Sequence, residues 1–150
     1  MLNSLASRPL HAAQAAPAPQ VTALGARVRV VANVPGNTVV LYTGSGLLLV
    51  DSGSAALAPA LRKALGTARV ATLFNTHYHA DQTGGNALFA KAGAQIRAHT
   101  ITRQWLGADI WSPAEDRWIK APPKEAVPTV TFRDRGELTA GAVRTAIGDY

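Results

Sequence analysis

The sequence predicts an α/β fold, because strand-like and helix-like patterns alternate along the chain. The four residues Leu47–Val50 are continuously apolar, as expected of a strand that is covered on both faces. Leu57, Leu61 and Leu65 then recur every four residues, which is the spacing of one buried helix face. Residues 69–75 are again rich in valine, leucine and phenylalanine and predict a second strand.

A series of shorter strands is predicted before this unit. Residues 27–32 alternate as a half-buried strand does. Pro-Gly-Asn at 35–37 predicts a turn, and residues 38–43 predict the next strand. Because Gly-Ser-Gly at 44–46 is a tight connection, residues 38–43 should pair with residues 47–50 as a hairpin.

Proline and glycine mark the expected helix ends. Pro59 suits a first helical turn and Gly66 a C-terminal stop. Residues 86–92 predict a second helix that buries Leu88 and Phe89. The remaining predicted elements are a strand at 95–98, a helix from a capping Thr100 to about Ile110, an irregular loop at 111–128, and strands at 129–132 and 142–147 joined around Gly136.

Three tryptophans lie in and beside this loop. We predict that Trp105, Trp111 and Trp118 are packing residues, because their spacing is helical or nearly so. The alternative is that they line a pocket, with residues 111–128 acting as a lid over a substrate.

The composition excludes several classes of protein. Hydrophobic residues make up 47% of the 150 residues and charged residues 16%, which predicts one ordered domain. The net charge is +6, but the basic residues are spread along the chain with few aromatics among them, so nucleic-acid binding is not predicted. No segment reaches the roughly 18 uninterrupted apolar residues of a membrane span. Since cysteine is absent, a metal would be held by histidine and carboxylates.

Residues 1–20 are predicted to be separate from a domain at 21–150. They are rich in alanine and proline, and residues 12–15 have the spacing of an export cleavage site. Residues 1–11 lack the uninterrupted apolar stretch of a signal peptide. A disordered leader and the remnant of a signal both fit, so the location stays open between periplasm and cytoplasm.

The strongest functional signal is the segment 77–86, which reads His-Tyr-His-Ala-Asp-Gln-Thr-Gly-Gly-Asn. Alternate side chains of an extended chain point the same way, so His77, His79 and Asp81 are predicted to project from one side of a strand end. Two imidazoles and a carboxylate suit a divalent metal, usually zinc. A His-x-His pair alone is common in loops without metal, but ligands of α/β proteins bind at strand ends.

The residues after these three are predicted to support the site. Thr83 or Asp81 could cap the following helix. Gly84 and Gly85 would let the backbone approach a bound group beside the positive end of that helix.

The motif resembles the His-x-His-x-Asp signature of the metallo-β-lactamase superfamily. Upstream, Leu49-Val50-Asp51-Ser52-Gly53 resembles that family's strand-end Asp-x-Gly. The likeness spans about residues 28–147 and corresponds to the N-terminal half of the family's αββα sandwich. It implies that residues 21–150 are a partial metallo-β-lactamase-like domain.

This resemblance implies roles for individual residues. His77 and His79 would be ligands of a first zinc, and Asp81 would serve a second zinc or hold and deprotonate the attacking water. Asp51 would orient the motif loop by hydrogen bonds, in a surrounding shell with Thr83, Gly84, Gly85 and Asn86. A zinc-bound hydroxide would attack an ester, amide or thioester-type bond of a small-molecule substrate.

Two departures from the family pattern change this expectation. Gln82 stands where many members have a histidine, and an amide is a poor zinc ligand, so a second zinc site is weakened. The family supplies a third histidine from a later segment, whereas the histidine after the motif here, His99, is interpreted as structural or exposed, and His11 as irrelevant. The chain is therefore predicted to be truncated before the remaining metal ligands. A missing C-terminal half is then the expected partner.

Two functions remain open from the sequence. The first is a zinc-dependent hydrolase of this superfamily. The second is a catalytically inactive fragment or pseudo-enzyme that binds metal weakly or serves as a structural or interaction module.

Overall fold

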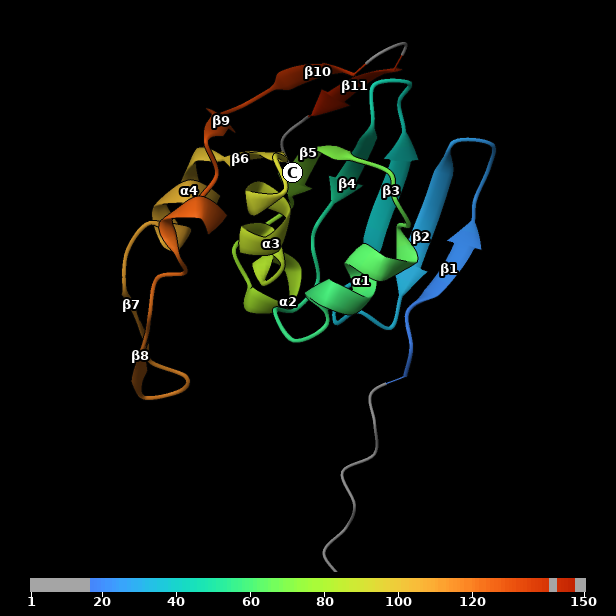
Figure 1. Cartoon of the computed structure of the whole chain (residues 1–150). Helices are drawn as coiled ribbons and strands as arrows, with labels where there is room; N and C mark the ends of the chain where they lie inside the picture. The colour runs from blue at the N-terminus through green and yellow to red at the C-terminus, as the bar shows by residue number, and fades with distance from the viewer. Residues whose placement is uncertain (1–16, 141–142, 148–150) are drawn as a thin grey trace, which may run out of the picture.

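The computed structural model describes residues 17–140 and 143–147 (Figure 1). The leader predicted for residues 1–20 lies mostly outside this range, and strand β1 begins at Gln20. The strands are β1 Gln20–Ala23, β2 Val28–Ala32, β3 Thr38–Tyr42, β4 Leu47–Val50, β5 Val70–Asn75, β6 Gln95–His99, β7 Ile110–Ser112, β8 Arg117–Ile119, β9 Val130–Phe132, β10 Gly136–Ala140 and β11 Val143–Ile147. The helices are α1 Ala58–Ala64, α2 Ala80–Thr83, α3 Asn86–Lys91, α4 Thr100–Leu106 and the 3-10 helix η1 Lys124–Ala126.

Seven of these strands form one mixed sheet in the order β1-β2-β3-β4-β5-β6-β9. The first four strands are antiparallel, and β4, β5, β6 and β9 run parallel. The parallel strands follow one another in one direction across the sheet. Right-handed crossovers then place all the connecting helices on the same face, which Figure 1 shows for α1, α2 and α3.

Two adjacent rows of residues, one on each face of this sheet, differ in burial. Neighbouring residues of a strand point to opposite faces, so residues aligned across the sheet form rows that belong to one face. The row that faces the helices is at most 1% exposed and consists of Val40, Leu49, Leu73 and Ile96. The adjacent row on the other face is half-buried and consists of Val39, Val50, Phe74 and Arg97.

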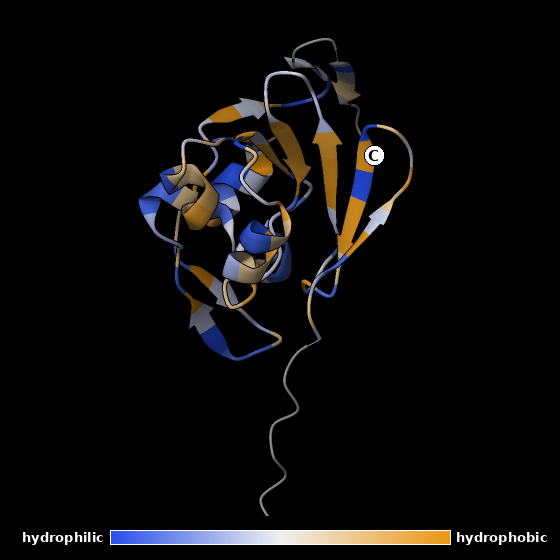
Figure 2. Ribbon diagram, turned by 45° about the vertical axis from the view of Figure 1, so that its right-hand side comes forward, coloured by the Kyte–Doolittle hydropathy of each residue, from blue (hydrophilic) through white to orange (hydrophobic). Residues whose placement is uncertain are grey.

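The hydrophobic core lies between the first row and the helices. Leu61 of α1 and Phe89 of α3 are both 0% exposed and pack into it. Burying side chains of this size stabilises a fold by roughly 1.5–3 kcal/mol each. Figure 2 shows long orange stretches along several strands, whereas the helices carry a mixture of blue, pale and orange residues.

The predicted α/β class is confirmed, and the strands and helices expected between residues 27 and 99 are all present. Pro59 lies in the first turn of α1, and Gly66 follows its end with a φ of +69°. Leu47–Val50 is the predicted inner strand, paired on both sides. Phe89 is buried as predicted, whereas Leu88 is only partly buried.

The predictions for the C-terminal third need correction. The helix predicted to run to about Ile110 ends at Leu106, and its N-terminal cap is His99 rather than Thr100. Residues 111–128 are not an irregular loop, because β7 and β8 form an antiparallel hairpin and η1 follows. Gly136 does not join two strands but begins β10.

Pairing between side chains explains the unexpected hairpin. Trp111 and Trp118 lie opposite each other, with ring centroids 5.8 Å apart. Such cross-strand aromatic pairs stabilise a hairpin despite nearby prolines. The predicted packing role of these two residues is therefore fulfilled only within the pair, since they remain 45% and 58% exposed.

Among the described residues, no helix has the length and apolar character needed to cross a membrane.

Candidate functional site

The motif follows strand β5, and the strand-end aspartate Asp51 follows the neighbouring strand β4. Because β4 and β5 are parallel, their carboxyl ends meet at the same edge of the sheet. This brings Asp51 into contact with Thr76, the residue before His77, although 25 positions separate Asp51 from Thr76.

A chain of hydrogen bonds runs from Asp51 to the first histidine. The Thr76 backbone N–H donates to Asp51 Oδ1 at 2.9 Å, and the Thr76 hydroxyl donates to Asp51 Oδ2 at 2.7 Å. The Thr76 oxygen also lies 2.9 Å from His77 Nδ1. Since the hydroxyl proton points to the carboxylate, His77 Nδ1 must be the donor in this contact. The Nε2 atom of His77 then carries the lone pair that a metal requires.

Asp51 is held in an unusual environment. It is 5% exposed, and its φ of +63° lies in the left-handed region that few non-glycine residues adopt. Burial raises the pKa of Asp51, while the hydrogen bonds from Thr76 and the nearby His77 oppose this rise. Backbone strain of this kind, at a cost of order 1–3 kcal/mol, concentrates at functional sites.

The three predicted ligands lie close in sequence but differ in backbone conformation. The rings of His77 and His79 contact edge to face, with centroids 4.7 Å apart. The extended chain ends at His79, and Asp81 lies exposed in the first turn of α2. The strand-like alternation that predicted a common direction for all three therefore stops at His79. Within the part of the chain that the structure describes, no three His, Cys, Asp or Glu side chains converge to hold a metal ion.

A buried amide pair lies beneath the motif. The Asn86 amide donates to Asn75 Oδ1 at 2.8 Å and accepts from Asn75 Nδ2 at 3.0 Å. It also accepts from the Ser52 hydroxyl at 2.9 Å and donates to the carbonyl of Ala126 at 2.9 Å. Ser52, Asn75 and Asn86 are all 0% exposed. This network joins the ends of β4 and β5, the start of α3, and η1.

Asn86 was predicted as a supporting residue, but sequence reasoning missed Ser52, Asn75 and Thr76. The available signal was local, since Asn75-Thr76 directly precedes the motif and Ser52 directly follows Asp51. Polar residues at the end of a buried strand need hydrogen-bond partners, and this requirement points to a network.

The two motif glycines permit close packing of the chain against itself. A Cβ on Gly84 would lie 2.3 Å from the Ala55 backbone nitrogen, and one on Gly85 would lie 2.4 Å from the Ser52 carbonyl oxygen. The close approach that the structure shows at these glycines is to residues 52–55, and approach to a bound group stays a prediction. The predicted caps are also absent, because no side chain caps α3 and the Thr83 hydroxyl donates to the His79 carbonyl at 3.0 Å.

Gln82 packs against the turn between β2 and β3. A Cβ on Gly36 would lie 2.2 Å from Gln82 Nε2, so the amide lies directly on the glycine backbone. Gly36 has a φ of +73°, which also favours glycine there. The Gln82 Nε2 atom lies 3.4 Å from Asp81 Oδ2. Gln82 thus contacts the site through its neighbour Asp81.

His99 has a structural role at the start of helix α4. Its Nδ1 accepts a hydrogen bond from the Ile101 backbone N–H at 3.2 Å and caps α4. Its Nε2 contacts the Arg133 carbonyl oxygen, and its ring packs edge-on against Phe132. Both ring nitrogens are therefore engaged by the backbone.

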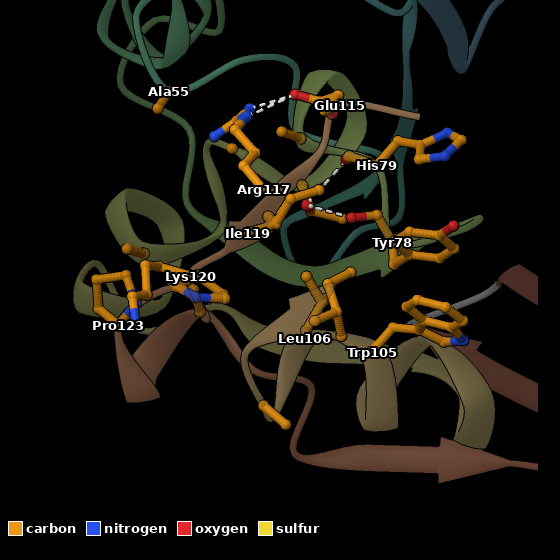
Figure 3. A pocket seen from close by; sticks show the side chains of 18 residues that line it. Ala55, Tyr78, His79, Trp105, Leu106, Glu115, Arg117, Ile119, Lys120 and Pro123 are labelled. Carbon is orange, nitrogen blue, oxygen red and sulfur yellow. Dashed lines mark hydrogen bonds and ion pairs between the residues drawn. The ribbon is translucent and has the colours of Figure 1, made fainter. Parts of the chain in front are cut away.

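A cavity of about 360 Å³ adjoins the motif (Figure 3). Tyr78, His79 and Ala80 line it from the motif, and Trp105 lines it from α4. The Tyr78 and Trp105 rings stack with centroids 4.7 Å apart and planes 12° from parallel. The β7–β8 hairpin and the following segment close the opposite side.

Comparison with known proteins identifies the family of this arrangement. Residues 31–146 match the sequence profile of the metallo-beta-lactamase superfamily. A search of curated proteins found no match.

Solved structures agree with this assignment. A metallo-beta-lactamase of Cronobacter sakazakii is 25% identical, with a TM-score of 0.72, over 86% of this chain and 52% of that chain. A subclass B3 metallo-beta-lactamase of Bradyrhizobium japonicum is 22% identical, with a TM-score of 0.66, over 83% of this chain and 49% of that chain. A metallo-beta-lactamase from Pontibacter korlensis is 19% identical, with a TM-score of 0.65, over 84% of this chain and 58% of that chain.

The chain thus spans about half the length of these solved relatives. The Cronobacter protein is described by the motif HARLDQ, and residues 77–82 here read HYHADQ. The two motifs share the first histidine, the aspartate and the final glutamine, so a glutamine in this position is compatible with the fold. With the sheet, the strand-end Asp51 and the motif all in place, the chain belongs to the metallo-β-lactamase superfamily.

Proposed function

We propose that this chain carries the metal-binding N-terminal half of a zinc-dependent hydrolase acting on a small-molecule substrate. His77 and His79 would bind zinc, and Asp81 would hold and deprotonate the attacking water or serve a second zinc ion. The observation that carries this proposal is the hydrogen-bond chain from Asp51 through Thr76 to His77. Carboxylate-oriented imidazoles of this kind are typical of zinc ligands.

The donor chemistry of the residues fits zinc in part. Two neighbouring imidazoles and a nearby carboxylate are suitable ligand types, but a catalytic zinc normally has three protein ligands. Among the residues that the structure describes, no third protein ligand converges with the two histidines at the motif. We propose that it comes from a C-terminal half, which would also complete any second site weakened by Gln82.

The reaction class follows from the chemistry of the site. A bound zinc ion would supply a water of lowered pKa and polarise the carbonyl of an ester, amide or thioester-type bond. Asp51 and Thr76 would keep His77 in one tautomer. Asp81, which is exposed beside the histidines, could accept a proton from the attacking water.

Zinc content of the full 150-residue chain tests this proposal. We expect metal after dialysis against micromolar zinc, and we expect His77→Ala to lose it. The matched control is His99→Asn, which removes another imidazole but keeps a side chain suited to cap α4. Well-folded protein without zinc would refute a metal site formed by this chain alone, and equal zinc in the His77→Ala variant would refute His77 as a ligand.

The second candidate is a non-catalytic module of the same fold. The observation in its favour is that three metal donors do not converge in the described residues. Zinc that binds without hydrolysis of any ester, thioester, lactone or β-lactam probe would support this candidate. Hydrolysis that His77→Ala abolishes would exclude it.

A further inference from the structure

The cavity beside the motif has the size and position of a ligand-binding subsite. Its volume of about 360 Å³ lies near the lower end of the roughly 300–1,000 Å³ typical of small-molecule pockets. It opens directly beside His79, which lines it together with the preceding Tyr78. A group held in it would therefore lie next to His79, one of the proposed metal ligands.

Small residues on the motif side leave this space empty. Ala80, Gly84 and Ala87 line the cavity from α2, its C-terminal end and α3. Larger apolar side chains face them, namely Leu106, Ile110 and Ile119. Cross-strand pairing of Ile110 with Ile119 puts both on the same face of the β7–β8 hairpin. The other face carries Trp111 and Trp118, which do not line the cavity.

The aromatic wall is suited to a flat ring. Tyr78 and Trp105 stack with their planes 12° apart, and Trp105 is 39% exposed although it lines the cavity. Figure 3 shows this stacked pair on one side of the cavity and Lys120 and Pro123 on the other. Aromatic rings prefer offset-stacked or edge-on partners, so the wall favours an aromatic occupant over a polar one.

The carboxylate and basic side chains that line the cavity already have opposite charges as partners. Arg117 donates to Glu115 at 2.8 Å, and both residues lie in the wall. Lys120 bonds to Asp109 at 2.6 Å. Since each cation is neutralised nearby, these charges do not select a charged occupant.

We infer that this cavity binds an uncharged aromatic group of the substrate and positions the bond to be cleaved beside His79. That the bound group belongs to a substrate rests on the proposed hydrolase function. The binding itself depends only on the cavity and its aromatic wall.

Calorimetric titration of the full chain with 2-naphthol, in the presence of a chelator, measures this binding without metal. We expect saturable binding at one site, weakened about tenfold or more by Trp105→Ala, because the stacked wall is lost. Ala87→Leu should weaken binding to a similar extent by filling the space. Trp118→Ala is the matched control on the other face of the hairpin, and it should bind 2-naphthol as the original chain does.

The outcomes separate this inference from the proposed function. No binding by the original chain, or equal binding by the Trp105→Ala and Ala87→Leu variants, overturns the inference whatever the zinc content. Tighter binding of naphthalene-2-sulfonate than of 2-naphthol overturns the uncharged character of the ligand. Binding with the expected variant effects but without zinc uptake supports the cavity as a binding site while refuting the hydrolase proposal.

Discussion

Asn75 and Asn86 face each other as a reciprocal amide pair, each donating to the side-chain oxygen of the other, at 3.0 and 2.8 Å. Both residues are completely buried. The pair links the end of β5 to the start of α3 across the base of the motif, so the motif loop is held at both of its ends.

Replacing Asn86 with alanine should destabilise the fold. The change removes the partner of the buried Asn75 amide and of the Ala126 carbonyl, whereas the Ser52 hydroxyl keeps the Gln82 carbonyl as an acceptor at 3.1 Å. Each unsatisfied buried group costs about 1–3 kcal/mol, so we expect a loss of about 2–4 kcal/mol in the free energy of unfolding. Urea denaturation measures it. Gln104→Ala, at an exposed position of α4, is the control and should change stability by less than about 0.5 kcal/mol. A similar small change for Asn86→Ala would contradict the network.

The buried carboxyl of Asp51 should make stability depend on pH. Burial raises its pKa in the folded protein above the value of 3.8 expected of an unfolded chain. In the pH window between these two values the folded state binds more protons than the unfolded state. The free energy of unfolding should therefore fall as pH rises through that window.

Asp51→Asn tests this assignment. Asparagine also tolerates the positive φ at this position, so the backbone need not change. We expect the variant to lose the fall in stability that begins near pH 3.8 in the original chain. Chemical denaturation at a series of pH values provides the comparison. Parallel curves for the two proteins would show that another group titrates.

Alanine at Gly84 should be poorly tolerated for steric reasons alone. The φ of Gly84 is −61°, which any residue adopts, but its Cβ would lie 2.3 Å from the Ala55 nitrogen. Overpacking of this kind typically costs about 1–3 kcal/mol, and we expect a lower midpoint of thermal unfolding. Gly25→Ala is the control, because nothing lies within 4 Å of its Cβ position. Equal midpoints for the two variants would mean that residues 52–55 move away easily.

His99 should contribute to stability as a helix cap. His99→Ala removes the acceptor of the Ile101 N–H at the start of α4 and should cost about 1 kcal/mol. Asparagine at the same position can restore the cap, so His99→Asn should recover most of that loss. Amide hydrogen exchange of Ile101 reports on the cap directly. Faster exchange in both variants would indicate that the imidazole ring contact with Phe132 matters more than the cap.

Local patterns in the sequence were sufficient for most of the sheet. The apolar run Leu47–Val50 and the turn at 35–37 depend on neighbouring residues, and both lie where the sequence predicted them. The β7–β8 hairpin was missed because proline suggested a loop. Its pairing depends on Trp111 and Trp118 meeting across the strands, which chain order alone does not indicate.

By itself, the sequence determined the family and the types of side chain available at the strand end, since the motif residues are contiguous. The tertiary structure decided which residues support them, because Thr76 meets Asp51 across 25 positions and Asn86 meets Ala126 across 40. It also decided that Asp81 lies in a helix rather than in line with the histidines. The reason is physical: hydrogen bonding and cavity shape depend on segments brought together by the sheet, and periodicity reports only on near neighbours.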